Sequence, residues 1–376
     1  MRYAVDAHAI GRHLTGNEVY VRSLLDAFAA IDGESEFLAY VTGREAAAAV
    51  PSRFTVRQIA RNPFVRLGLD FGRKLREDRP ALLHVQYTAP LRCPVPIVVS
   101  VHDVSFLEHP EYFTRARALQ LRVTVARTVR SAVRIITGTE FARDSIVRAY
   151  GLSQDRISVI PDAANPFFRA ANRAQAVRGV EERFRIRAPF VLSVGDLQPR
   201  KNHIGLIHAF GRLLTQYPEL PHHLVLAGKD TWHGERVHEA ARQSGVADRI
   251  HFPGFVSDND LLQLYNACDC FAFPSLYEGF GLPVLEAMAC GRAVVCSDTS
   301  SIPEVAGNAA LLFNPAHDRD ITAALSKVLL NPDLRARLER MGQAQAAHFT
   351  WSKTAEATLG LYREVSGQPL LTHATA

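Results

Sequence analysis

The chain has 376 residues, of which 47% are hydrophobic and 22% are charged, enough to bury two hydrophobic cores and to form two or three domains. It carries no apolar run close to the ~18 residues that a membrane-spanning helix needs, and its first residues lack the apolar core of a signal peptide. Its five cysteines form no C-x-x-C pair, which predicts reduced core residues in a cytoplasmic protein.

Charge is divided unevenly along the chain. Residues 1–190 carry 28 Lys and Arg against 19 Asp and Glu, whereas residues 191–376 carry 15 against 19. The first half is therefore basic and the second half is acidic. This asymmetry predicts that the first half meets an anionic partner.

Strand and helix patterns alternate throughout, which predicts parallel sheets covered by helices on both faces. The expected strands are 2–6, 37–41, 82–85, 97–101, 134–137, 190–194, 224–227, 250–252, 270–273, 293–296 and 310–313. The clearest helices in the first half are 17–30 and 114–132. We place a hinge near 161–189, between an N-terminal domain at 1–170 and a C-terminal domain at 188–350. Ligands of open α/β sheets bind beyond the carboxyl ends of the strands, so residues that follow strands are the site candidates.

Two candidate segments in the first half follow predicted strands. Gly16 lies in a turn ahead of a helix, in LTGNEVYVRSLL, and His102 leaves a β-rich run in VVSVHDVSF. Turns of this composition are common, and a lone histidine is more often structural than catalytic. A Ser-His-Asp hydrolase is disfavoured, because the sequence shows no G-x-S-x-G motif to supply the nucleophile.

The helix predicted at 114–132 is rich in arginine and contains no acidic residue. On a helical wheel Arg115, Arg122, Arg127 and Arg130 fall within about 140°, at roughly 100° per residue. The plain alternative is a core-packed helix with a solvated face. Together with the basic first half, the pattern predicts peripheral attachment to anionic lipid at the inner face of a membrane, or an acceptor that bears a lipid diphosphate.

A basic turn opens the second half, in VLSVGDLQPRKN at 191–202. A strand ends at Gly195, and Arg200 and Lys201 follow near the start of the next helix. Cations beside free backbone N–H groups would neutralise a leaving diphosphate. The alternative is a solvated basic loop. Lys229 in LVLAGKD is a further, weaker candidate for contact with the same ligand.

The most specific signal is FPSLYEGFGLPVLEAMACG at 273–291, in which Glu278 and Glu286 stand eight residues apart across a glycine-rich turn. The turn leads from a strand into a helix predicted at 283–290, and a helix N-terminus binds phosphate. Gly281 lets a ligand approach the backbone closely. Carboxylates accept hydrogen bonds from hydroxyls but repel phosphate, so the matching ligand has hydroxyls on both sides of a phosphate group, as a nucleotide sugar does. The alternative is a buried turn with two solvated glutamates.

This segment resembles the E-x7-E motif of the retaining glycosyltransferases of family 4, and the resemblance extends from Asp6 to about Tyr362. It implies an α/β chain with the GT-B fold, in which two Rossmann-like domains face each other across a cleft. It also implies that the last helix, 351–366, crosses back to the N-terminal domain. The apolar periodicity of this helix predicts Trp351, Ala355, Leu359 and Tyr362 as its core residues.

The resemblance assigns a role to each part of the motif. Glu278 would hold hydroxyls of the transferred sugar, and Glu286 would hold the ribose. The backbone of Phe280, Gly281 and Leu282 would lie against the sugar and the diphosphate.

Residues outside the motif receive roles in the same way. Lys201 would contact the donor diphosphate, and His102 would contact the sugar being transferred. The backbone at Gly16 would approach the donor phosphates and the acceptor. Many members carry an arginine where this chain has Asp196, and Arg200 would take over its role.

The nucleotide base would lie beside Phe255 and Val256, which follow a strand. The next residues, Asp258-Asn259-Asp260, spell the D-x-D motif that binds a divalent metal in another class of glycosyltransferase. Here the triplet opens a helix, where Ser257 or Asp258 would cap the N-terminus. We therefore expect capping at this place and no essential metal.

The reaction implied is transfer of a hexose from a nucleotide diphosphate sugar to a hydroxyl of a saccharide or lipid-linked acceptor, at the front face and with retention. VGDLQPRKN and HDVSFLEHPEYF resemble bacterial mannosyltransferases of polysaccharide assembly, so the expected donor is GDP-mannose. No cofactor and no nucleic-acid partner are expected. The alternatives are a nucleotide-sugar epimerase of GT-B fold and a non-catalytic nucleotide-sugar binding protein.

Overall fold

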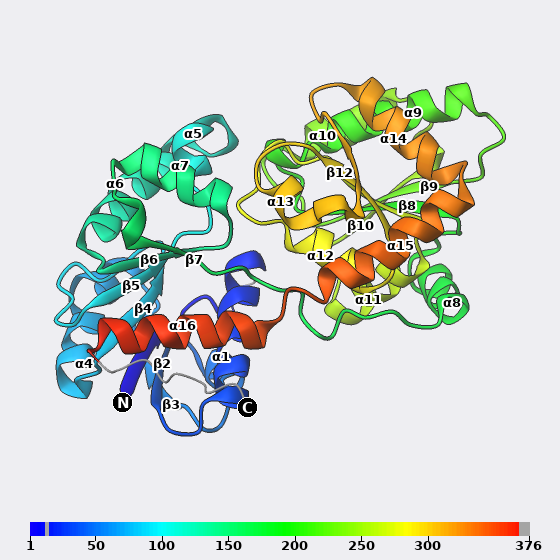
Figure 1. Ribbon diagram of the computed structural model, residues 1–376. Coiled ribbons are helices and arrows are strands. Elements are labelled where there is room, and N and C mark those ends of the chain that lie inside the picture. The colour runs from blue at the N-terminus through cyan, green and yellow to red at the C-terminus, as the bar shows by residue number, and fades with distance from the viewer. Residues whose placement is uncertain (12–14, 368–376) are drawn as a thin grey trace. The chain divides into compact units, whose positions relative to one another are not determined.

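The chain divides into two compact units in the computed structural model, which describes residues 1–11 and 15–367 (Figure 1). Unit 1 comprises Met1–Asp162 together with the residues from Thr350 onward, and unit 2 comprises Ala163–Phe349. Each unit has its own parallel sheet and its own buried core. The two parallel α/β sheets predicted from the sequence are confirmed.

Unit 1 is built on a seven-stranded parallel sheet in the order β3-β2-β1-β4-β5-β6-β7. Its strands are β1 (Arg2–Asp6), β2 (Glu36–Val41), β3 (Thr55–Gln58), β4 (Leu82–Gln86), β5 (Ile97–Ser100), β6 (Arg134–Thr137) and β7 (Ile157–Val159). The five predicted strands are all present. The sequence did not predict β3 and β7, because both are short strands at the edges of the sheet, and half-exposed edge strands lack the apolar run of a central strand.

The helices of unit 1 are α1 (Thr15–Ile31), α2 (Arg44–Ala48), α3 (Pro63–Val65), α4 (Phe71–Asp78), α5 (Ser105–Glu108), α6 (Arg115–Ser131), α7 (Glu140–Tyr150) and α16 (Trp351–Val365). We predicted that Gly16 lies in a turn ahead of the helix. This was wrong, because α1 begins at Thr15 and Gly16 lies in its first turn. The last helix, α16, packs against α1, so its return to the first unit is confirmed. Its predicted core residues Trp351, Ala355, Leu359 and Tyr362 are buried.

Unit 2 is built on a six-stranded parallel sheet in the order β10-β9-β8-β11-β12-β13. Its strands are β8 (Phe190–Val194), β9 (His223–Ala227), β10 (Ile250–Gly254), β11 (Cys270–Phe273), β12 (Ala293–Ser297) and β13 (Leu311–Phe313). All six were predicted. The strand order runs outward in both directions from the neighbours β8 and β11, so these two strands mark the point where the winding reverses.

The helices of unit 2 are α8 (Arg173–Phe184), α9 (His203–Gln216), α10 (Gly234–Gln243), α11 (Asp258–Ala267), α12 (Leu282–Ala289), α13 (Ile302–Ala306), α14 (Asp318–Leu329) and α15 (Pro332–Ala346). Helix α8 packs against α11, so residues 163–189 of the stretch that we assigned to the hinge belong to unit 2. In the described part of the chain no helix has the length and apolar character needed to cross a membrane.

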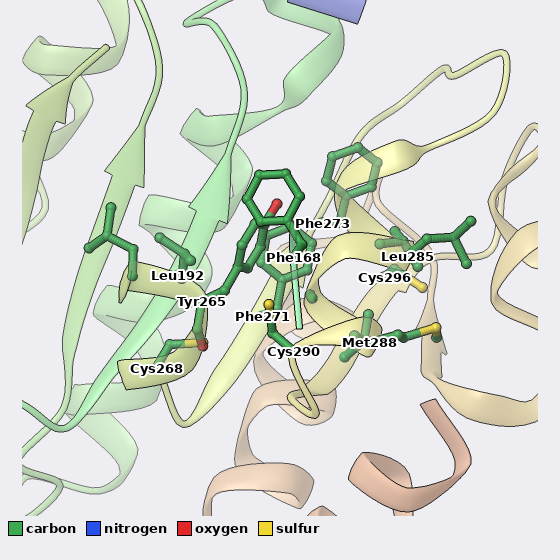
Figure 2. Close-up of a cluster of buried hydrophobic side chains, with 14 of the residues drawn as sticks. Phe168, Leu192, Tyr265, Cys268, Phe271, Phe273, Leu285, Met288, Cys290 and Cys296 are labelled. Carbon is green, nitrogen blue, oxygen red and sulfur yellow. The ribbon is translucent and has the colours of Figure 1, made fainter. Parts of the chain in front are cut away.

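Aromatic and sulfur-containing side chains form a buried cluster in unit 2, as Figure 2 shows. Phe271 and Phe273 of β11 stack with their ring centroids 5.9 Å apart, and Leu285 and Met288 of α12 belong to the same cluster. Cysteines 268, 270, 290 and 296 are buried and unbridged, as predicted, whereas Cys93 of unit 1 is unbridged but only partly buried. The core therefore fixes α12 on the sheet beside the end of β11.

Candidate active site

The loops after β8 and β11 carry the basic turn and the two-glutamate motif. Since these strands are hydrogen-bonded neighbours at the reversal point of the sheet, their carboxyl ends open at one place. That place is where open α/β sheets bind ligands. Residues from the two loops, far apart in the sequence, therefore meet at one end of unit 2.

Lys201 is folded back over the end of its own strand. Its ammonium lies 4.7 Å from the centre of the Phe273 ring, and its aliphatic chain passes over Gly195, where an added Cβ would lie 3.0 Å from Lys201 Cδ and Cε. The positive φ of Gly195, +154°, also favours glycine. The side chain is consequently buried although it is charged.

Glu278 forms an ion pair with Lys201 and another with Arg200. Lys201 Nζ lies 2.7 Å from Glu278 Oε1, and Arg200 Nη1 lies 2.6 Å from Oε2. Burial alone would raise the pKa of Glu278, but the charges of Arg200 and Lys201 outweigh burial and hold it at about 2. Burial lowers the pKa of Lys201, and Glu278 opposes that effect. The three groups form one buried charge cluster with a net positive charge.

Two serines after β12 hold the backbone of the Glu278 loop. The Glu278 N–H donates to Ser300 Oγ at 3.1 Å, and the Ser301 hydroxyl reaches the carbonyls of Glu278 (2.8 Å) and Phe280 (3.1 Å). Ser300 has a left-handed backbone, with φ of +56°, which costs free energy in a non-glycine residue. Sequence reasoning missed both serines, since nothing in their spacing ties them to Glu278.

The glycine-rich turn leads into the N-terminus of α12. Gly281 is the N-cap residue with φ of +105°, and Pro283 stands in the first turn. An added Cβ at Gly281 would lie 2.7 Å from the side chain of Ile302. Glycine is therefore required here, and the helix begins four residues after Glu278, with the positive end of its dipole at this end of the sheet.

Glu286 lies further along α12 and is buried in the core. The hydroxyl of Tyr265, from α11, donates to Glu286 Oε2 at 2.9 Å. Burial raises the pKa of Glu286 to about 7, although the hydrogen bond from Tyr265 opposes the rise. The two glutamates therefore differ in charge state. Glu278 is ionised at pH 7, whereas Glu286 has a pKa of about 7, so its carboxyl group can either accept or donate a hydrogen bond.

The segment after β10 offers an exposed aromatic ring. Phe255 is 58% exposed, and Lys229 Nζ stands 4.7 Å from the centre of its ring. Val256 is partly buried and packs on the core of unit 2. An exposed ring held by a cation offers a flat surface on which a base can stack.

The triplet Asp258-Asn259-Asp260 opens α11, and one of its acids, Asp260, takes part in capping. Ser257 is the N-cap residue, its hydroxyl accepts from the Asp260 N–H at 3.2 Å, and it donates to Asp260 Oδ2 at 2.8 Å. The predicted capping is confirmed. The ranges that the structure describes contain no group of three or more His, Cys, Asp or Glu side chains placed to hold a metal ion.

Asp196 is also used locally. Its carboxylate accepts from the Lys229 N–H at 3.1 Å and so joins the loop after β8 to the loop after β9. Arg200 instead reaches Glu278 and the carbonyl of Tyr277, at 3.3 Å. Arg200 is thus the second cation of the cluster.

In unit 1 the structure links two further predicted residues through a glutamine. His102 Nε2 lies 3.2 Å from Gln86 Oε1, and Gln86 Nε2 donates to the Asn17 carbonyl at 3.0 Å, next to Gly16. Since the amide nitrogen donates to a carbonyl, its oxygen faces the imidazole and Nε2 carries the proton. Burial lowers the pKa of His102 to about 4, so the ring is neutral at pH 7.

Two polar residues at the end of β1 escaped the sequence analysis. Asp6 is buried, and His8 Nδ1 lies 2.8 Å from its Oδ1. Burial opposes ionisation of Asp6, but His8 outweighs it and lowers the pKa of the carboxyl. β1 and β4 are the neighbours at the reversal point of the sheet in unit 1, so polar residues directly after the first strand were the available signal.

Comparison with known proteins points in one direction. Residues 181–345 match the family model of glycosyl transferases group 1, and residues 14–166 match that of glycosyltransferase family 4. The chain is 32% identical to the O-antigen chain mannosyltransferase B of Escherichia coli over 266 residues, covering 71% of this chain and 70% of the relative. It is 34% identical to the serotype-specific mannosyltransferase WbdA of Escherichia coli, covering 59% of this chain and 27% of WbdA.

Solved structures share the fold at low sequence identity. Sucrose-phosphate synthase of Thermosynechococcus elongatus superposes with a TM-score of 0.79 at 18% identity, over 98% of this chain and 99% of that chain. Anabaena HepE in complex with UDP-glucose gives 0.76 at 18% identity, over 97% and 100%. These likenesses extend across both units and establish the fold, GT-B, that the sequence predicted.

Proposed function

The chain belongs to the group 1 and family 4 glycosyltransferases, and we propose that it moves a hexose from a nucleoside diphosphate sugar. The acceptor in this proposal is a hydroxyl of a saccharide or of a lipid-linked molecule. One observation carries the proposal: Arg200 and Lys201 converge on Glu278 at 2.6 and 2.7 Å, where the strands β8 and β11 end beside the N-terminus of α12. Two cations and a helix N-terminus suit a diphosphate.

The cation pair would stabilise the leaving group. As the bond between the sugar C1 and the phosphate oxygen breaks, charge builds on the diphosphate, and Arg200 and Lys201 are already held in place to receive it. Glu278 keeps the two cations in position, and its carboxylate oxygens are also acceptors for sugar hydroxyls. Positioning and charge stabilisation are thus the main contributions of these residues.

Retention at C1 fits the electrostatics of Glu278. A carboxylate whose pKa is held at about 2 by two cations is a weak base and a poor nucleophile. We therefore assign no covalent step to it. The acceptor oxygen bonds to C1 on the face that the phosphate leaves, and the acceptor proton passes to the departing phosphate oxygen. His102 is our candidate for a contact with the transferred sugar, as a neutral imidazole.

The nucleoside would be held by residues further from the diphosphate. Glu286, with a pKa near 7 and a fixed contact to Tyr265, is assigned to the ribose hydroxyls. Phe255, with its exposed ring, and Val256 are assigned to the base. Two fixed cations supply the positive charge that a divalent ion supplies in other enzymes, so we propose a reaction without an essential metal.

GDP-mannose is the donor that we propose, because relatives of this chain over most of its length are named mannosyltransferases. A thermal-shift screen of GDP-, UDP- and ADP-sugars tests this assignment. A ligand at about a hundred times its dissociation constant adds roughly 2.7 kcal/mol of stability, so GDP-mannose should raise Tm most. Lys201→Ala should lose the shift, whereas Lys327→Ala, an exposed lysine of α14 in the same unit, should keep it. A larger shift with a UDP- or ADP-sugar would contradict the donor assignment.

A further inference from the structure

Unit 1 presents large apolar side chains to solvent. Five of them are between 61% and 87% exposed: Phe64, Leu69, Leu91, Leu119 and Val123. Isolated exposed apolar residues are ordinary on a protein surface, but a contiguous group marks an interaction site. Whether these five form one surface depends on how the three segments that carry them pack.

The three segments lie side by side. The Leu91 N–H donates to the Leu67 carbonyl at 2.8 Å, which places the loop that carries Leu91 against the π-helical turn Arg66–Asp70. The other side of the same loop contacts α6, because Arg127 donates to the Pro90 carbonyl at 3.0 Å. The loop therefore joins α3 and the turn that follows it, which bear Phe64 and Leu69, to α6, which bears Leu119 and Val123.

Within α6 the apolar residues lie among the arginines. At about 100° per residue, Leu119 falls inside the arc that contains Arg115, Arg122 and Arg130, and Val123 falls about 20° beyond Arg130, at the edge of that arc. Arg122, Val123 and Arg130 also line one shallow depression on this helix. The exposed face of α6 is thus both basic and aliphatic.

Arg127 does not belong to this exposed set, which corrects the sequence prediction. Its guanidinium binds the carbonyls of Pro90 and Ala89 and is partly buried. Burial lowers its pKa, and its role is to attach the loop to the helix.

Five exposed arginines around the apolar residues have no carboxylate partner among the described residues. Arg61, Arg92, Arg115, Arg122 and Arg130 are exposed, and within residues 1–11 and 15–367 no carboxylate forms an ion pair with any of them. The residues from 114 to 134 include no acid at all. Any surface that covers the apolar residues must therefore also supply negative charge.

We propose that this basic–apolar face, comprising the five exposed apolar residues and the five arginines around them, docks on the surface of an anionic lipid bilayer. The aliphatic side chains would enter the boundary between headgroups and acyl chains, and the arginines would meet the lipid phosphates. An anionic bilayer satisfies both requirements at once, since it offers negative charge above an apolar layer. The inference concerns unit 1 alone and is independent of the donor bound in unit 2.

Flotation with vesicles tests the proposal. The full chain should bind vesicles of phosphatidylglycerol and phosphatidylcholine at about 0.05 M salt, release them at about 0.5 M, and ignore phosphatidylcholine alone. Replacing Arg115, Arg122 and Arg130 by glutamine should weaken binding roughly a hundredfold, at about fivefold per arginine. The matched control replaces Arg319, Arg337 and Arg340, three exposed arginines of unit 2, by glutamine and changes the net charge equally.

A fluorescent reporter separates insertion from adsorption. Leu119→Trp should show a blue-shifted emission on anionic vesicles, whereas Leu330→Trp, at an exposed position of unit 2, should not. Equal loss of binding in the two arginine variants, or no shift for Leu119→Trp, would overturn the proposal. A change in oligomeric state of the arginine variant in sedimentation would overturn it too, by assigning the face to a second copy. The thermal shift with GDP-mannose, measured on the same variants, reports separately on the proposed function.

Discussion

Replacing Glu278 by glutamine keeps the shape of the side chain and removes the charge that Lys201 and Arg200 face. The ordinary pKa of this carboxyl is 4.5, and the folded protein holds it at about 2, which corresponds to about 3 kcal/mol of stabilisation at pH 7. Loss of one partner of a buried ion pair has a comparable cost, about 3–5 kcal/mol. We expect Glu278→Gln to lower the free energy of unfolding by this order at pH 7.

The pH dependence identifies the cause. Because the folded-state pKa is depressed, the contribution is fully present above pH 4.5 and is lost as pH falls toward 2. Urea unfolding should therefore show a difference between wild type and variant that falls to less than half near pH 3. The control is Glu235→Gln, which removes an exposed ion pair with Arg242 worth no more than about 1 kcal/mol. A loss at pH 7 no larger than that of the control, or one that is independent of pH, would refute the reasoning.

Three further predictions concern the same unit. Glu286→Gln should stabilise the free protein at pH 8, because ionisation of the buried Glu286 lowers the free energy of unfolding as pH rises from 4.5 through about 7. The same substitution should weaken GDP binding by about 1–3 kcal/mol. An unchanged affinity in calorimetry would remove Glu286 from the ribose site. Lys201→Ala should lower kcat and kcat/KM together, as expected for a contact that tightens in the transition state, whereas a rise in KM alone would make it a simple binding residue. EDTA should leave activity largely intact, and loss of activity that manganese or magnesium restores would show that a metal is needed.

The sequence predicted where the site lies but not how its charges pair. Arg200, Lys201 and Glu278 all follow predicted strands, and the carboxyl ends of neighbouring parallel strands open at one edge. Their ion pairs join residues 77 and 78 positions apart, and only the strand order β8-β11 brings them together. Spacing along the chain contains no information on that order.

The hydrogen-bond partners of buried polar groups could not be predicted from the sequence either. Periodicity correctly predicted Tyr362 as a core residue of the last helix, but its hydroxyl lies 2.5 Å from Nδ1 of His84, a residue 278 positions away. Tyr265 is likewise a core residue whose hydroxyl binds Glu286. A hydrophobic pattern identifies the buried ring, whereas the partner of its hydroxyl depends on tertiary packing.

The sequence also did not predict which arginines of α6 are exposed. A helical wheel groups Arg127 with Arg122 and Arg130, yet Arg127 binds loop carbonyls and the other two face solvent. Leu119 and Val123, which the wheel places among these arginines, are exposed because no other segment of unit 1 covers this side of α6 in the described structure. Helical position fixes the direction of a side chain, and the neighbouring loop decides whether it is covered.

Incubation of GDP-α-mannose with the enzyme alone, followed by proton NMR, tests the central claim most directly. Water can take the place of the acceptor hydroxyl, so we predict slow release of GDP together with α-mannose as the first-formed anomer, faster in wild type than in Lys201→Ala. β-Mannose as the first product would contradict front-face transfer with retention. Conversion to a different GDP-sugar without release of GDP would show an epimerase, and an unchanged donor in the presence of binding would leave a nucleotide-sugar binding protein in place of the enzyme that we propose.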